Sequence, residues 1–200
     1  EAFAEVKALM HVKQMQALDV IGEIAGEFEQ AFGRSSGGLV RRYRSADAET
    51  VVVALGSVLG TIEDAVDELR DQGVSVGAVG ITCFRPWPLA ELRAALGHAG
   101  RVVVLEKAFA VGLGGIVAQN VRLALGGLPA RVYDVVGGLG GRPITRASVL
   151  RLLGDVREDR LEPGALTFLD LDWELVQREL ERPFGPHAEN ILRDLAAGSR

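Results

Sequence analysis

Short apolar runs, each followed by a turn and then a helical pattern, constrain this fold more than any other feature of the sequence. The clearest stretch is Thr50–Thr61, TVVVALGSVLGT, which opens with valine, alanine and leucine without polar alternation. Such a run is typical of a strand covered on both faces, as in a parallel sheet flanked by helices. After Gly56 and Ser57 turn the chain, Thr61 can cap a helix that ends at Gly73. The stretch therefore predicts half of a βαβ unit.

The same plan recurs along the chain. Further buried strands are predicted at VSVGAVGITCF, RVVVLEK and ARVYDVV, each leading into an amphipathic helix. The alternating segment LVRRYR predicts a half-exposed strand, whose Arg41, Arg42 and Arg44 form either a small anion-binding patch or, as we favour, a solvated sheet edge. The sequence thus predicts a three-layer α/β/α fold with a mostly parallel sheet of about five strands.

The chain divides into three predicted parts. Residues 1–33 form a long amphipathic helix with no capping residue before it, which we interpret as a connecting helix from a missing N-terminal domain. Residues 34–153 hold the α/β domain, and residues 154–200 form a helical tail extension containing DWELVQRELE and HAENILRDLAA. A helix that packs on a missing domain should expose an apolar stripe. The side chains of this expected stripe are Phe3, Val6, Met10 and Phe28.

Composition excludes several classes of protein. The net charge of -5 is spread along the chain, so no basic surface for nucleic acid is predicted. The single cysteine, Cys83, excludes a disulfide within the chain, a four-cysteine zinc site and a self-contained iron-sulfur cluster. We interpret Cys83 as a buried, inert thiol. No segment resembles a membrane span or a signal peptide, so a cytoplasmic location is expected.

The turns after the predicted strands form the candidate binding edge. Because the carboxyl ends of parallel strands meet at one edge, we expect Gly56-Ser57, Arg85-Pro86, residues 112–115 and residues 137–142 to converge on one rim. The glycines fit neither the dinucleotide fingerprint nor a P-loop. Their amides can hold an anion at a helix start, and close helix-to-strand packing explains the glycines equally well.

No catalytic set is predicted. The histidines, His11, His98 and His187, lie away from the predicted rim, so Ser57 has no base to activate it. Glu106 and Asp134 each end a predicted strand near the rim, and an ordinary hydrogen-bonded role is the favoured interpretation for both.

Several motifs occur in an order that resembles a known family. FGRSSGGLVRRYR, TVVVALGSVLGTIEDAVDELRDQGVSVGAVGI, CFRPWP and VVGGLGGRPIT together resemble the 2-oxoacid:ferredoxin oxidoreductases, the pyruvate:ferredoxin family. The resemblance is to the second domain of the alpha subunit, which has the fold of the transketolase carboxyl-terminal domain. It covers residues 1–153 and is strongest over 50–142. Trp87 replaces a usual phenylalanine, Glu106-Lys107 stands where an aspartate is frequent, and the tail matches no family segment.

The resemblance implies a reaction carried out by a larger complex. Thiamine diphosphate attacks a 2-oxoacid such as pyruvate, carbon dioxide leaves, electrons pass through iron-sulfur clusters to ferredoxin, and coenzyme A takes the acyl group. The G-D-G motif that would hold the diphosphate and its magnesium is absent, as are cluster cysteines. The implied role of this chain is therefore structural, in assembly. Its implied partners are a thiamine-pyrimidine domain, a thiamine-diphosphate beta subunit, gamma and ferredoxin-like subunits, and ferredoxin, in an oligomer.

The candidate site residues are those on the predicted rim. If the rim contacts coenzyme A or a partner loop, the resemblance favours Gly56, Ser57, Arg85 and Arg142. Alternatively, the two arginines hold loops through backbone carbonyls. Two other functions stay open: the carboxyl-terminal domain of a transketolase or pyruvate dehydrogenase beta subunit, and a stand-alone α/β module that binds a small anion.

Overall fold

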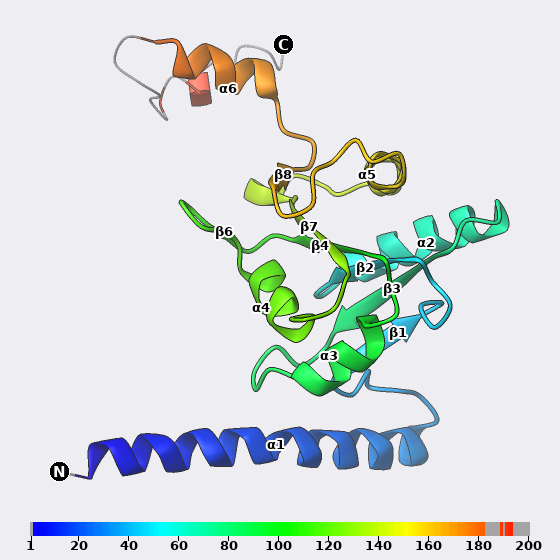
Figure 1. Ribbon diagram of the computed structural model, residues 1–200, viewed down its shortest axis with the longest axis vertical. Helices are drawn as coiled ribbons and strands as arrows, with labels where there is room; N and C mark the ends of the chain where they lie inside the picture. The colour runs from blue at the N-terminus through cyan, green and yellow to red at the C-terminus, as the bar shows by residue number, and fades with distance from the viewer. Residues whose placement is uncertain (1, 183–188, 190, 194–200) are drawn as a thin grey trace. The chain divides into compact units, whose positions relative to one another are not determined.

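A computed structural model of the chain describes residues 2–182, 189 and 191–193 (Figure 1). Within these residues the main sheet has six strands in the order β1-β3-β2-β4-β7-β8. The strands are β1 (Val40–Tyr43), β2 (Thr50–Ala54), β3 (Val76–Ile81), β4 (Arg101–Glu106), β7 (Arg131–Val136) and β8 (Leu166–Phe168), and a separate hairpin pairs β5 (Phe109–Ala110) with β6 (Gly114–Gly115). The helices are α1 (Phe3–Phe32), α2 (Val58–Asp71), α3 (Leu89–Leu96), α4 (Ile116–Ala124), α5 (Arg146–Arg157) and α6 (Trp173–Leu180), with a short 3-10 helix at Leu139–Gly141.

The mostly parallel sheet is confirmed. Strands β3, β2, β4, β7 and β8 run parallel, and only β1 runs antiparallel, pairing Val40 with Ile81 at the edge of the sheet. The predicted apolar runs form its centre, where every residue of β2 is buried. The sheet continues past residue 153, because β8 pairs with β7 and adds one strand to the five expected.

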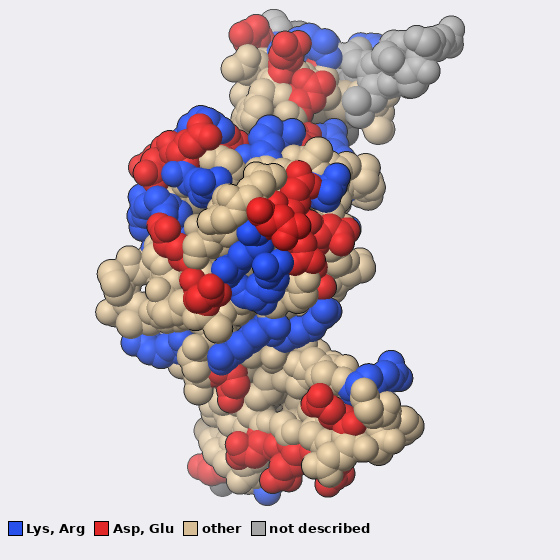
Figure 2. Space-filling model, turned by 90° about the vertical axis from the view of Figure 1, so that its right-hand side faces the viewer, with Lys and Arg blue, Asp and Glu red and all other residues tan. Residues whose placement is uncertain are grey.

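The edge strand β1 is a solvated edge, as favoured from the sequence. Arg41 forms an ion pair with Glu63, and Arg44 forms one with Asp67, both on α2. Figure 2 views the side of the molecule that carries β1 and α2, and blue and red side chains gather there next to one another. Charged side chains on an edge strand discourage pairing with another sheet.

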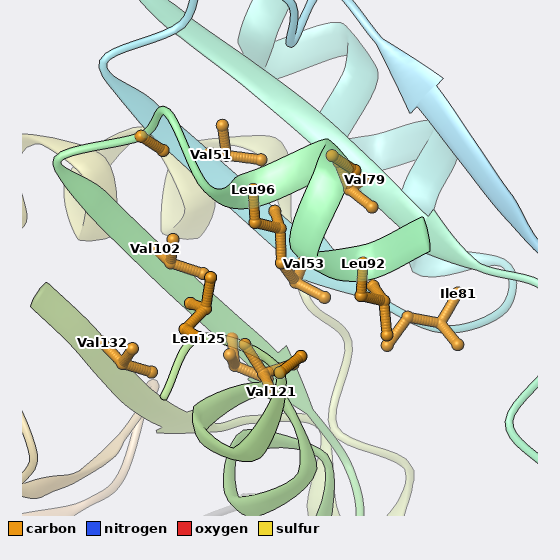
Figure 3. Packing of buried hydrophobic residues seen from close by; sticks show 14 of the residues in the cluster. Val51, Val53, Val79, Ile81, Leu92, Leu96, Val102, Val121, Leu125 and Val132 are labelled. Carbon is orange, nitrogen blue, oxygen red and sulfur yellow. The ribbon is translucent and has the colours of Figure 1, made fainter. Parts of the chain in front are cut away.

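Helices cover both faces of the sheet, which confirms the three-layer prediction. On one face, α3 and α4 close a valine-rich core with side chains from β2, β3 and β4 (Figure 3). The residues labelled there are Val51, Val53, Val79, Ile81, Leu92, Leu96, Val102, Val121, Leu125 and Val132. On the other face, α2 and α5 pack on the alternate residues of the same strands. Both faces are buried, which explains the uninterrupted apolar runs.

The connection from β7 through α5 to β8 has the opposite hand to the connection from β4 through α4 to β7. Both connections step in the same direction along the sheet, yet α4 covers one face and α5 covers the other. The loop between β7 and α5 must therefore lead towards α2. It brings Ile144 against the α2 side of the core, where Val58 also packs.

Helix α2 begins earlier than predicted. Its N-cap is Ser57, whose backbone is already helical at φ -66 and ψ -19, so the turn continues directly into the helix. Thr61 is consequently an internal residue, and the cap we predicted for it is wrong. The predicted cap at Thr145 is confirmed, because its side-chain oxygen accepts a hydrogen bond from the N–H of Ser148 at 3.1 Å. Gly73 follows α2 with a left-handed φ of +78, as predicted for a helix end.

Helix α1 has no fully buried residue. Phe3, Val6 and Met10 of the expected stripe are 73%, 52% and 56% exposed. Phe28 is half-buried, because its ring lies 4.7 Å from that of Phe32 and under the guanidinium group of Arg34. Among the described residues, every helix is too short or too polar to traverse a lipid bilayer.

The chain separates into one compact unit that ends at Leu169 and a second that begins at Asp170. In the second unit, α6 matches the predicted helix DWELVQRELE, and the carboxylate of Asp172 caps it by accepting the N–H of Leu175 at 2.9 Å. Most of the second predicted tail helix, HAENILRDLAA, lies outside the described residues.

Candidate functional site at the carboxyl edge of the sheet

The order of the strands creates a switch point between β2 and β4. From β2 the chain crosses to β3 on one side, whereas from β4 it continues to β7 on the other side. The connections that leave these two neighbouring strands therefore diverge at their carboxyl ends. Open α/β sheets bind ligands in the crevice outside such a pair of strands.

A cavity of about 310 Å³ lies at this switch point. The residues that follow β2 and those that end β4 form its opposite walls, and the first turn of α4 contributes Val117. Its full lining is Leu55, Gly56, Ser57, Val58, Leu105, Glu106, Lys107, Ala108, Val117 and Ile144. The lining is mainly apolar with a few polar groups, which is the usual character of a small-ligand pocket.

Ser57 and Lys107 are the exposed polar side chains of this lining. The hydroxyl of Ser57 makes no capping hydrogen bond at the start of α2. Lys107 forms no ion pair with any described residue. A hydroxyl and an ammonium beside an apolar wall can bind a small ligand that carries a polar or anionic group, but they do not form a nucleophile-and-base pair.

Glu106 lines the cavity and is a buried residue, 5% exposed. Its two oxygens accept hydrogen bonds from the N–H groups of Val117 and Ala118, each at 2.8 Å. Both N–H groups belong to the first turn of α4. The N-cap residue, Gly115, has no side chain that could accept their hydrogen bonds. Burial raises the pKa of Glu106, and the nearby carboxylate of Asp134 acts in the same direction, whereas the backbone N–H groups oppose the rise.

Asp134 lies beside Glu106 and is also buried. One of its oxygens accepts the N–H of Gly115 at 3.3 Å and lies 3.7 Å from a guanidinium nitrogen of Arg122. A Cβ atom on Gly115 would collide with carboxylate oxygens of both Glu106 and Asp134. The hydrogen-bonded role predicted for the two carboxylates is confirmed, and their joint contact with Gly115 anchors the start of α4 to β4 and β7.

The predicted site residues take different positions on the rim. Gly56 and Ser57 line the cavity. Arg142 is exposed and follows the 3-10 helix. Gly138 comes just before that helix, and a Cβ atom on Gly138 would lie 2.7 Å from Cε of Lys107. The loop that leads to Arg142 thus borders the cavity wall.

Arg85 lies outside the lining of this cavity. Its guanidinium group donates to the carbonyl of Phe84 at 2.7 Å and to Oδ1 of Asn120 at 3.1 Å. It also lies over the rings of Phe84 and Trp87, at 4.1 and 5.8 Å from their centroids. Arg85 therefore ties its own loop to α4, in part through a backbone carbonyl.

The histidines and the cysteine do not join the site. Nε2 of His98 lies 2.8 Å from the carbonyl oxygen of Ser45, and His11 is exposed on α1. His187 lies outside the described residues. Cys83 is half-buried rather than buried, and its thiol donates to the carbonyl of Pro86 at 3.5 Å. In the part of the chain that the structure describes, no three His, Cys, Asp or Glu side chains gather closely enough to hold a metal ion.

Comparison with known proteins assigns the family. Residues 48–149 match the family described as pyruvate:ferredoxin oxidoreductase core domain II. The chain belongs to this family. The matched range contains β2, β4, α4 and every residue that lines the switch-point cavity.

Curated relatives extend the match beyond that range. Pyruvate synthase subunit PorA of Methanothermobacter thermautotrophicus is 38% identical over 149 residues, which cover 74% of this chain and 37% of the relative. Pyruvate synthase subunit PorA of Thermotoga maritima is 38% identical over 169 residues, which cover 84% of this chain and 42% of the relative. The chain thus spans about two fifths of the length of these relatives.

Among solved structures, a 2-oxoglutarate:ferredoxin oxidoreductase from Magnetococcus marinus, with 2-oxoglutarate, coenzyme A and succinyl-CoA bound, aligns with a TM-score of 0.41 and 22% identity. The alignment covers 55% of this chain and 18% of that one.

Sequence reasoning missed Lys107 and Ile144 as lining residues. Lys107 follows directly after an apolar strand, and the rule that binding residues follow the carboxyl ends of strands was sufficient to include it. Ile144 comes from a loop with no periodic pattern, and only the path of that loop towards α2 brings it to the cavity.

Proposed function

We propose that this chain forms the second domain of the alpha subunit of a thiamine-diphosphate-dependent 2-oxoacid:ferredoxin oxidoreductase. The proposed reaction is oxidative decarboxylation of a 2-oxoacid such as pyruvate to acyl-CoA and carbon dioxide, with reduction of ferredoxin. The family match over residues 48–149 carries the proposal, and it favours this family over the transketolase and pyruvate dehydrogenase alternatives.

Within that enzyme we propose a structural role without catalytic residues. The chain has one cysteine and no G-D-G motif, so its residues do not fit an iron-sulfur cluster or the diphosphate of thiamine with its magnesium. These cofactors are therefore proposed to bind elsewhere in a cytoplasmic complex. Exposed apolar side chains on α1 support an assembly role, because such a surface is typical of a protein interface.

We propose that Gly56 and Ser57, in the cavity, and Arg85 and Arg142, on the same rim, contact coenzyme A or a loop of a partner subunit. The free hydroxyl of Ser57 and the exposed position of Arg142 support this proposal. In the assembled enzyme, Ser57→Ala and Arg142→Gln are then expected to raise the KM for coenzyme A about tenfold, the effect of one lost hydrogen bond to a charged group. An unchanged KM in both variants would exclude contact with coenzyme A.

The test of the overall function is native mass spectrometry of the chain purified from its source, with thiamine diphosphate and iron quantified in the same sample. We expect a large complex that contains both and that reduces ferredoxin when pyruvate or 2-oxoglutarate and coenzyme A are supplied. The isolated chain is expected to be inactive. A species of 21.3 kDa, or its dimer, free of both cofactors would contradict the proposal and favour a stand-alone anion-binding module.

A further inference from the structure

A second hollow, which we call the arginine cavity, lies beside the edge strand β1 and shares Gly56 with the switch-point cavity. Its volume is about 650 Å³. The polar residues of its lining are Ser35, Ser36, Thr82, Arg41 and Arg42. The lining contains no acidic side chain among the described residues, so its charged groups are all positive.

The three arginines near β1 are not equivalent. Arg41 is neutralised by Glu63 at 2.9 Å, and Arg44 by Asp67 at 2.7 Å. Arg42 follows Arg41 on the strand and is exposed. It forms no ion pair with any described residue. Of the two arginines in the lining, Arg42 is therefore the one whose positive charge no described acidic side chain neutralises.

The loop that carries the serines is held firmly against the end of β3. The N–H groups of Thr82 and Cys83 donate to the carbonyl of Leu39 at 3.1 and 3.0 Å. The hydroxyl of Thr82 lies 3.4 Å from the carbonyl oxygen of Gly37. Gly37 has a left-handed φ of +90, and a Cβ atom there would lie 2.8 Å from the Thr82 hydroxyl oxygen. A loop fixed in this way loses little conformational entropy when a ligand binds.

The serine hydroxyls add hydrogen-bond donors to the positive charge. The oxygen of Ser35 accepts the N–H of Gly37 at 3.1 Å, which leaves its own O–H available to donate. Ser36 lines the cavity with a hydroxyl that makes no hydrogen bond to a described residue. A guanidinium group has several donors and no acceptor, and its planar geometry fits two oxygens of a tetrahedral oxyanion.

We propose that the arginine cavity binds a phosphate group through Arg42, Ser35 and Ser36. The cavity is large enough for a phosphate that carries an organic substituent as well as for inorganic phosphate. This inference concerns a site additional to the proposed function and does not depend on it.

The test is a titration of the full chain, labelled with 15N, with inorganic phosphate and separately with glycerol 3-phosphate, each compared with chloride at the same ionic strength and pH. We expect saturable shifts of the amide signals of residues 35–38 with the phosphates and not with chloride. Tighter binding of glycerol 3-phosphate would identify a phosphate ester as the ligand, and tighter binding of the inorganic ion would identify free phosphate.

Two variants of neighbouring arginines make the test specific. Arg42→Gln should weaken phosphate binding about tenfold, the effect of losing one charge-assisted hydrogen-bonding partner. Arg44→Gln should leave binding unchanged, because Arg44 is paired with Asp67 and is absent from the lining. Shifts that do not saturate, or an equal loss in both variants, would overturn the proposal. Ser36→Ala, which removes only a donor, should weaken binding with the amide spectrum of the sheet unchanged.

Discussion

The absence of a side chain at Gly115 allows α4 to begin close to β4 and β7. Gly115 has φ -71 and ψ 136, which alanine adopts without strain, so its role is to leave space for the carboxylates of Glu106 and Asp134. We expect Gly115→Ala to lower the free energy of unfolding by about 1–3 kcal/mol, as overpacking of a buried site does. Urea denaturation followed by circular dichroism measures the change.

Gly60→Ala is the matched control for this substitution. Gly60 lies within α2 and has no atom within 4 Å of the position its Cβ would take. Replacing a helical glycine by alanine at an open position should raise stability by about 0.5–1 kcal/mol. Equal effects of the two substitutions would show that the contact of Gly115 with the two carboxylates has no energetic importance.

The raised pKa of Glu106 predicts that the stability of the fold depends on pH. Because the folded state binds a proton at Glu106 more tightly than the unfolded state, the stability from this group is fully present below the ordinary glutamate pKa of about 4.3. It is lost as the pH rises through the raised pKa. The unfolding free energy of the wild type should therefore fall, relative to that of Glu106→Gln, as the pH rises from about 4 to neutrality.

Glu106→Gln keeps the size of the side chain but does not titrate, so the difference between the two proteins isolates this carboxyl group. The variant also loses one acceptor for the N–H groups of Val117 and Ala118, which adds an offset that is independent of pH. Urea midpoints at a series of pH values separate the two effects. A difference that stays constant with pH, or that changes in the other direction, would contradict the burial argument.

At the scale of secondary structure, the two helices that follow rim turns differ in how they are capped. Thr145 caps α5 through its hydroxyl, whereas Ser57 makes no side-chain cap at α2. Thr145→Ala should therefore lower the free energy of unfolding by about 1 kcal/mol, and Ser57→Ala should leave it nearly unchanged. Thermal unfolding of the two variants, side by side, checks the prediction. A similar loss for Ser57→Ala would mean that its hydroxyl also supports the helix.

The same two helices show what the sequence can and cannot predict about elements. The apolar run of β2 and the Thr145 cap are local patterns, and both were found correctly. The start of α2 was misplaced because Thr61 is a good capping residue, whereas the backbone of Ser57 is already helical. Strand β8 has only three residues, and its assignment to the sheet follows from its register with β7 rather than from any local pattern.

For the candidate site, the sequence predicted the edge of the sheet but not the arrangement of side chains on it. Gly56 and Ser57 follow β2, and the strand-end rule correctly placed them on the carboxyl rim. The position of both Glu106 and Asp134 against Gly115 depends on the register of β4 and β7, in which Asp134 lies opposite Val104, two residues before Glu106. Register across parallel strands is a tertiary property, so the joint anchoring of α4 was not predictable from spacing alone.

At the scale of the whole molecule, α1 carries apolar surface that the α/β unit does not use. Its half-buried residues begin at Ala17 and include Ile21 and Phe28, whereas Phe3, Val6 and Met10 are exposed. The core layers on both faces of the sheet are complete without α1. The first half of α1 is therefore available for contact with another part of the proposed enzyme.

This separation of roles gives the last prediction. Val6→Lys combined with Met10→Lys places charges on exposed positions, so the free energy of unfolding should change by less than about 0.5 kcal/mol. If the stripe is buried on assembly, the same charges must lose their water, and the complex with the partner subunits should no longer form. Urea denaturation measures the first effect, and native mass spectrometry of the co-expressed subunits measures the second.

The matched control introduces two lysines at positions of α1 that are already half-buried in the isolated chain. Ile21→Lys combined with Phe28→Lys should lower the stability of the isolated chain, because both side chains are partly withdrawn from water before any partner binds. The two pairs of substitutions thus separate a contribution to folding from a contribution to assembly. Normal assembly of the Val6 and Met10 variant would show that the exposed stripe is not the interface, and the assembly role of α1 would then have to be abandoned while the fold and the rim remain.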